Sequence, residues 1–116
     1  VLAQVSHLPH LIAFSVMYGL LQFSQSRQSP IEKVDPLVYA GSAFADLTRV
    51  AASPIEMWRD ICLANREALL AAITSFEATL ARMKAALAEG DGATLFADIE
   101  RARQERQRLT RLREEK

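Results

Sequence analysis

The chain has a single cysteine, Cys62, among its 116 residues, and this scarcity excludes two kinds of small protein. One thiol supports neither a disulfide framework nor a zinc site. Cys62 lies in an apolar helical pattern, where we expect it to be a small buried hydrophobe. An unpaired thiol suits a reducing compartment, and we therefore expect a cytoplasmic protein.

Glycine, proline and aromatic residues are also scarce, with 4 Gly, 4 Pro and 7% aromatics. Long stretches consist instead of Ala, Leu, Glu, Arg and Met, which favour helices. Half of the residues are apolar, so the composition permits a hydrophobic core. We predict an all-α fold in a single domain, residues 1–116.

Neither sign of charge is in excess, because 14 Lys and Arg residues balance 14 Asp and Glu residues. Such a chain has no bulk attraction to nucleic acid or to an anionic membrane. Arginines recur through residues 101–113, but glutamates interleave with them, which is typical of a solvated helix face. We predict neither a nucleic-acid nor a membrane partner.

No apolar run reaches the roughly 20 residues that a membrane-spanning helix needs. We predict a helix over residues 2–23 that is apolar on nearly every side, so it must be covered all round. A monomer of this length hardly provides that cover, and we therefore expect a homodimer. The chain starts at Val1 inside this apolar pattern, which suggests a piece of a longer protein.

Three further helices are predicted, after a loop over residues 24–36. The second starts after Gly41 and ends near Ala52, and the third spans residues 54–89. A capping box, with Ser53 as the N-cap, is expected to open the third helix. That helix carries a heptad stripe of Leu69, Ile73, Phe76, Leu80, Met83 and Leu87.

The third helix is expected to end at Gly90, in the left-handed conformation that glycine adopts readily. A fourth helix is predicted over residues 93–113, packed on the third as a long antiparallel hairpin. The sequence shows no Gly-rich phosphate loop and no strand-turn-helix fingerprint. We therefore predict that this chain binds no nicotinamide cofactor and is inactive by itself.

Three side chains could carry binding chemistry. His7 and His10 share a helix face, and no third ligand lies nearby in sequence, so we predict no metal. These imidazoles either cap the first helix or donate a hydrogen bond in a substrate cleft. Trp58 suits core or interface packing.

Arg49 has two interpretations on physical grounds alone. It could form a surface pair with Asp46, three residues earlier, worth a few tenths of a kcal/mol. Alternatively, its guanidinium could hold a carboxylate with two parallel hydrogen bonds, close to the positive end of the third helix.

Three motifs, in order, resemble those of prephenate and arogenate dehydrogenases. Residues 6–10 read Ser-His-Leu-Pro-His, residues 45–53 read Ala-Asp-Leu-Thr-Arg-Val-Ala-Ala-Ser, and residues 54–61 read Pro-Ile-Glu-Met-Trp-Arg-Asp-Ile. Asn65 matches an asparagine that follows in the family. The resemblance covers residues 5–70 well. Ala45 departs from it by replacing a common arginine, and the segment 23–40 is longer than in compact members.

The resemblance implies an intertwined dimerisation domain, like the C-terminal domain of 6-phosphogluconate dehydrogenase, that covers the substrate. The full enzyme would carry an N-terminal Rossmann domain with the catalytic histidine. It would convert prephenate to 4-hydroxyphenylpyruvate, or arogenate to tyrosine, with NAD or NADP. By matched position, Arg49 would hold a substrate carboxylate, and His10, His7 and Trp58 would line the site. Asp46 would lie near a gate at the subunit boundary.

Two alternatives to a dehydrogenase domain remain at this stage. One is a stand-alone helical interaction protein, in which Arg49 and Trp58 are structural. The other is a regulatory module that senses tyrosine.

Overall fold

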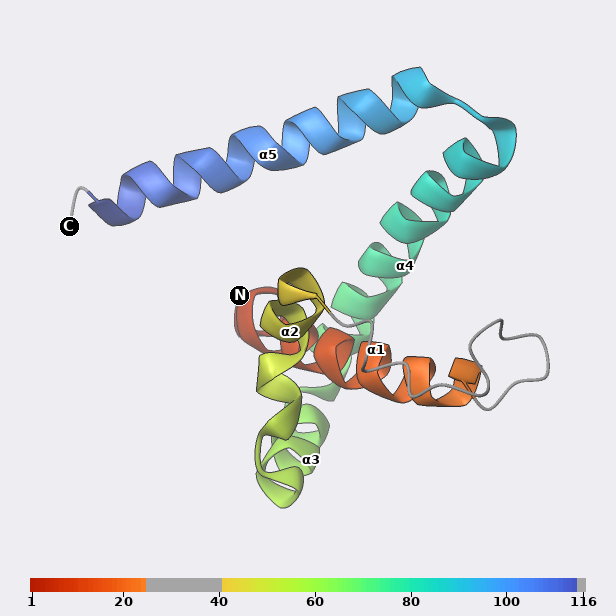
Figure 1. Ribbon diagram of the computed structural model, residues 1–116. Coiled ribbons are helices and arrows are strands. Elements are labelled where there is room, and N and C mark those ends of the chain that lie inside the picture. Colours follow the sequence, from red (N-terminus) through yellow and green to blue (C-terminus); the bar gives the residue numbers. More distant parts are fainter. Residues whose placement is uncertain (25–40, 115–116) are drawn as a thin grey trace. The chain divides into compact units, whose positions relative to one another are not determined.

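The computed structural model describes residues 1–24 and 41–114 (Figure 1). Most of the predicted loop, residues 25–36, lies outside the described residues. Every regular element in the described ranges is helical, so the all-α prediction is confirmed. None of these helices is long and apolar enough to cross a membrane. The elements are η1 (Ala3–His7), α1 (Leu8–Ser24), α2 (Ser42–Thr48), η3 (Arg49–Ala52), α3 (Ile55–Ala64), α4 (Arg66–Glu89) and α5 (Gly92–Glu114).

The chain forms two compact units, and the first is Val1–Ile73. Within it, α1 contacts η1, α2 and η3. The buried positions hold mainly small side chains, such as Ala3, Ala13 and Ala72, which let helices approach closely. Thr48 is buried as well, and its hydroxyl donates to the Phe44 carbonyl at 2.7 Å.

The predicted first helix is present, but its first turns are wider than those of an α-helix. Over Ala3–His7 the backbone is a π-helix, in which the Leu8 amide donates to the Ala3 carbonyl five residues earlier. Pro9 gives the physical reason. A proline ring in a regular helix collides with the carbonyl four residues before it, and proline has no amide hydrogen to donate. Widening the turn ahead of Pro9 relieves that conflict.

The predicted N-cap of the third helix is wrong. The Ser53 hydroxyl donates backwards to the Val50 carbonyl and closes the 3-10 turn η3. Pro54 has an extended ψ of 128° and occupies the cap position of α3 without a side-chain hydrogen bond. The backward bond spans only three residues, so the Ser53 hydroxyl bonds within the turn and does not cap α3. The sequence pattern alone fits a capping box.

The single helix predicted over residues 54–89 is also wrong, because Asn65 divides it into α3 and α4. Asn65 has φ −117° and ψ 37°, which lie outside helical geometry. Its amide still donates to the Ile61 carbonyl at 3.2 Å, and its own carbonyl accepts from Leu69 at 3.0 Å. The hydrogen-bond ladder therefore passes through the junction while the backbone turns.

The second unit, Thr74–Lys116, contains α4 from Thr74 onward and the whole of α5. Gly90 has φ 65°, as predicted for the end of the third helix. The Asp91 amide donates to the Ala86 carbonyl at 2.8 Å and the Gly90 amide to Leu87 at 3.2 Å, which is a Schellman motif. Asp91 then caps α5 by accepting hydrogen bonds from the amide and hydroxyl of Thr94. Those two bonds lower the pKa of the Asp91 carboxyl.

The lengthwise packing predicted for the hairpin is absent. In the described chain α4 and α5 are not among the helix pairs that pack together, and Figure 1 shows them meeting only at their turn. Arg82 and Asp98 form a bidentate ion pair near that turn, at 2.8 and 3.1 Å. Beyond residue 100 the α5 surface is mostly charged, so it offers the apolar stripe of α4 no continuous partner.

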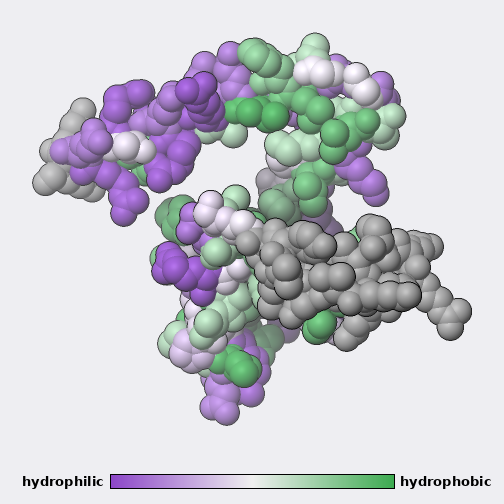
Figure 2. Space-filling view, in the orientation of Figure 1, coloured by the Kyte–Doolittle hydropathy of each residue, from purple (hydrophilic) through white to green (hydrophobic). Residues whose placement is uncertain are grey.

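Large apolar side chains consequently remain exposed in the described chain. Leu80 and Leu87 of α4 are 54% and 68% exposed, and Phe96 and Ile99 of α5 are 68% and 61% exposed. Figure 2 shows apolar side chains gathered around the turn between α4 and α5, and hydrophilic ones over the end of α5. On a soluble protein, a gathering of exposed apolar side chains commonly marks an interaction surface.

Substitutions at Gly90 and Gly92 form a matched pair that tests the left-handed backbone at Gly90. A β-carbon at Gly90 or at Gly92 would meet no atom within 4 Å, but only Gly90 has a positive φ. We expect Gly90→Ala to lower the free energy of unfolding by about 1 kcal/mol, the cost of a left-handed alanine. Gly92→Ala should leave stability unchanged or slightly raised. Urea denaturation at one fixed protein concentration measures both, and equal effects would refute the explanation.

Candidate functional site

The two histidines flank the junction between η1 and α1. The His10 ring donates from Nδ1 to the Ser6 carbonyl at 2.9 Å, one helical turn earlier. That carbonyl lies in the widened turn ahead of Pro9, so the irregular backbone and the imidazole orientation are linked. His7 and His10 are both half-buried.

Trp58, on the first turns of α3, contacts the rings of both histidines. It is 8% exposed. The His10 ring stacks on the indole at a centroid distance of 3.7 Å and an interplanar angle of 18°. The His7 ring meets the indole edge-on, at 6.0 Å and 81°. Aromatic pairs in these geometries contribute roughly 0.5–1.5 kcal/mol beyond the area that they bury.

Asn65 completes this cluster from the junction of α3 and α4. Its side-chain amide nitrogen lies 3.3 Å from His7 Nδ1, across 58 residues of sequence. The residue that interrupts the predicted long helix therefore reaches the histidine motif. We call His7, His10, Trp58 and Asn65 the His–Trp cluster.

Arg49 lies at the start of η3, which packs against α1, and its side chain is exposed. Within residues 1–24 and 41–114, neither Arg49 nor Asp46 forms an ion pair or a side-chain hydrogen bond. The surface pair between them is therefore not formed. Among the described residues, no carboxylate occupies the Arg49 guanidinium.

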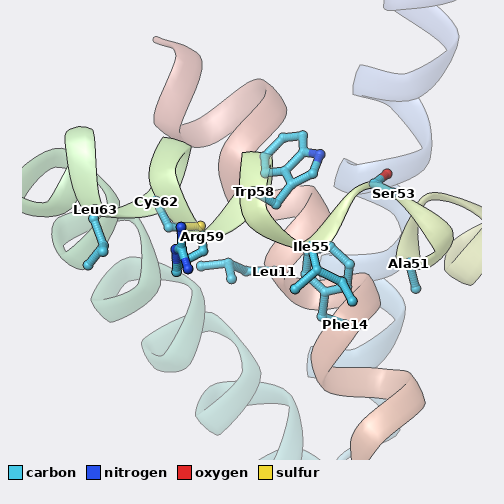
Figure 3. A pocket seen from close by; sticks show the side chains of 9 residues that line it. All are labelled: Leu11, Phe14, Ala51, Ser53, Ile55, Trp58, Arg59, Cys62 and Leu63. Carbon is cyan, nitrogen blue, oxygen red and sulfur yellow. The ribbon is translucent and has the colours of Figure 1, made fainter.

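An open apolar pocket of about 460 Å³ lies between α1 and α3 (Figure 3). Trp58 forms part of its wall, together with Leu11 and Phe14 from α1. The charged residue in this wall is Arg59, whose guanidinium forms an ion pair with the exposed Asp60 carboxylate at 2.9 Å. The remaining lining residues are Ala51, Ser53, Ile55, Cys62 and Leu63.

Cys62 is half-buried in this pocket, not fully buried as expected. Burial raises the pKa of its thiol, so it stays protonated at neutral pH. No group of three or more His, Cys, Asp or Glu side chains in the described part of the chain could hold a metal ion.

His7, His10 and Trp58, the aromatic candidates predicted from the sequence, lie in contact in the structure. Arg49 and Asp46 make no bond to them. The contact of Asn65 and the apolar pocket were not predicted. For the Asn65 contact, the only sequence signal was the match of Asn65 to an asparagine of the family motif. For the pocket, no local sequence pattern gives a signal.

Residues 1–101 match the family described as "Prephenate dehydrogenase, dimerization domain". The chain is 38% identical over 106 residues to cyclohexadienyl dehydrogenase of Zymomonas mobilis, covering 89% of this chain and 34% of that protein. It is 31% identical over 107 residues to prephenate dehydrogenase of Bacillus subtilis, covering 90% of this chain and 27% of that protein. The chain thus spans about a third or less of these relatives.

Solved structures show the same fold. The crystal structure of prephenate dehydrogenase from A. aeolicus, in complex with hydroxyphenyl propionate and NAD+, has a TM-score of 0.81 and 33% identity. That match covers 93% of this chain and 36% of the other. Synechocystis arogenate dehydrogenase has a TM-score of 0.80 over 93% of this chain and 37% of the other; its 19% identity supports the fold alone.

The family match over residues 1–101, the relatives and the shared all-helical fold agree. This chain therefore belongs to the prephenate dehydrogenase family and corresponds to its dimerization domain.

Proposed function

We propose that this domain joins two subunits and covers the substrate in a dehydrogenase acting on prephenate or arogenate. The observation that carries the proposal is Arg49, an exposed cation without a carboxylate partner in the described chain. It begins η3, which packs against α1, the helix that carries His10. A guanidinium there is suited to a substrate carboxylate, because it makes two parallel hydrogen bonds.

In this proposal His10 and His7 line the substrate site, and both contact Trp58. Stacked and edge-on contacts hold both imidazoles in place before a ligand arrives, which reduces the entropy that binding costs. Asp46, exposed three residues before Arg49, is proposed to lie near a gate at the subunit boundary.

The cofactor belongs to another part of the full-length enzyme. The described ranges contain no strand, and the four glycines of the chain form no phosphate-binding fingerprint. These residues do not fit a dinucleotide. We propose that NAD or NADP binds an N-terminal Rossmann domain with the catalytic histidine, and that this chain alone binds neither cofactor and is inactive. A cytoplasmic location is part of the proposal.

Dimerisation is supported by the apolar surface that the chain leaves uncovered. In the described part no large side chain is fully buried, and Leu80, Leu87, Phe96 and Ile99 are all more than half exposed. Burying such a side chain is worth roughly 1.5–3 kcal/mol. We propose that the apolar stripe of α4 forms part of the interface between two intertwined copies.

We predict that the chain is a dimer at micromolar concentration. Leu80→Glu combined with Leu87→Glu should weaken dimerisation at least ~100-fold, because losing two buried leucines costs about 3 kcal/mol or more. Analytical ultracentrifugation over a concentration series measures the dissociation constant.

Ala85→Glu is the matched control, because Ala85 is exposed on the opposite side of the same helix from this stripe. It should leave the dissociation constant unchanged. A well-folded, soluble wild-type monomer would refute the proposed dimer.

For the substrate, we predict that Arg49→Ala in the full-length dehydrogenase weakens substrate capture by about 2–4 kcal/mol, the range for losing one side of a desolvated charge pair. Arg49→Lys should restore only part of the loss, since an ammonium cannot form two parallel bonds. The change should appear mainly in KM if the contact is equal in ground and transition states. Steady-state kinetics measures both variants.

Arg82→Ala serves as the control arginine, because Arg82 pairs with Asp98 in the second unit and matches no substrate motif. It should leave KM unchanged. Normal KM and turnover in Arg49→Ala would contradict the substrate role of Arg49.

A further inference from the structure

The bond between Asn65 and His7 determines where the His7 proton lies. An amide nitrogen can only donate, so His7 Nδ1, 3.3 Å from Asn65 Nδ2, must accept with its lone pair. A neutral imidazole carries one proton, and here that proton is on Nε2. His7 therefore presents an N–H donor at its other nitrogen.

His10 is held in the opposite tautomer. The Ser6 carbonyl can only accept, so His10 Nδ1 carries the proton, and the bond measures 2.9 Å. In the neutral ring Nε2 then keeps its lone pair. His10 therefore presents an acceptor where His7 presents a donor.

Both Nε2 atoms are available to a ligand. Neither His7 nor His10 makes a hydrogen bond through Nε2 within the described residues. In that same part of the chain no buried side-chain nitrogen lacks a partner, so both atoms reach solvent. The two rings contact the same indole, so both histidines belong to one cluster.

We propose that Asn65 is a positioning residue that fixes His7 as the Nε2–H tautomer, so that the histidine pair offers a ligand one donor and one acceptor. The break in the helix at Asn65 coincides with this bond, since the residue with non-helical backbone angles is the one whose side chain reaches His7. That the ligand is the substrate rests on the function proposed above. The tautomer of His7 does not rest on it.

The test is the protonation state of each imidazole nitrogen in the 15N-labelled chain. Long-range 1H–15N spectra are recorded at about pH 8.5, where an ordinary imidazole is neutral. His7 should show protonated Nε2 and bare Nδ1, and His10 the reverse. In Asn65→Asp the carboxylate can only accept, so the His7 Nδ1 resonance should shift to the protonated position.

His10 is the internal control, because its partner is the Ser6 carbonyl and its pattern should persist in Asn65→Asp. Arg66→Gln, exposed and one residue beyond the junction, should leave both rings unchanged. A protonated His7 Nδ1 in the wild-type chain overturns the proposal, and so does an Asn65→Asp spectrum in which Nδ1 remains bare. The wild-type spectrum decides alone if the variant does not fold.

Kinetics separates this inference from the function on which its ligand rests. In the full-length dehydrogenase, Asn65→Asp should raise KM about tenfold, the loss of one neutral hydrogen bond. An unchanged KM with the shifted Nδ1 resonance would overturn the ligand role and leave the tautomer assignment standing. An unchanged KM in Arg49→Ala would refute the substrate proposal without affecting either spectrum.

Discussion

The stack of His10 on Trp58 is the contact on which the candidate site depends. It joins α1 to α3, and the edge-on contact of His7 with the same indole and the bond from Asn65 to His7 adjoin it. Pro9 contributes indirectly, since the wide turn ahead of it contains the Ser6 carbonyl that orients the His10 ring. Two motifs far apart in sequence thereby become one cluster on a buried indole.

The rest of the molecule is organised around an incomplete core. The first unit packs on alanines at Ala3, Ala13 and Ala72, which allow close helix contacts but bury little apolar area. Large apolar side chains at Leu80, Leu87 and elsewhere stay exposed. This pattern is the one expected of a domain whose core is completed by a second copy, and it agrees with membership of a dimerization-domain family.

Local sequence signals predicted which parts of the chain are helical, but not every break between helices. The apolar run before residue 24, the left-handed Gly90 and the final helix all appear where they were expected, because each depends on neighbouring residues. The three motifs also identified the family. The N-cap prediction for Ser53 was wrong because a serine hydroxyl can bond either to a preceding carbonyl or to a following amide. The backbone conformation of the turn decides between these two partners.

Long-range contacts account for the remaining errors. The break at Asn65 accompanies a bond to a residue 58 positions away, which helical periodicity cannot reveal. Lengthwise packing of α4 on α5 requires a continuous apolar face on α5. The arginines and glutamates of α5 interrupt such a face. Of the candidate site, the identities of His7, His10 and Trp58 were predictable, whereas their stacking and the adjoining pocket required the fold.

A double-mutant cycle between His10 and Trp58 tests the central claim most directly. His10→Ala, Trp58→Leu and the double variant are unfolded in urea at one protein concentration, because the proposed dimerisation would make apparent stability concentration-dependent. The stacked geometry predicts a coupling energy of about 1 kcal/mol. Single effects that add to within about 0.3 kcal/mol would show that the two rings do not support one another, and the account of the site would fail.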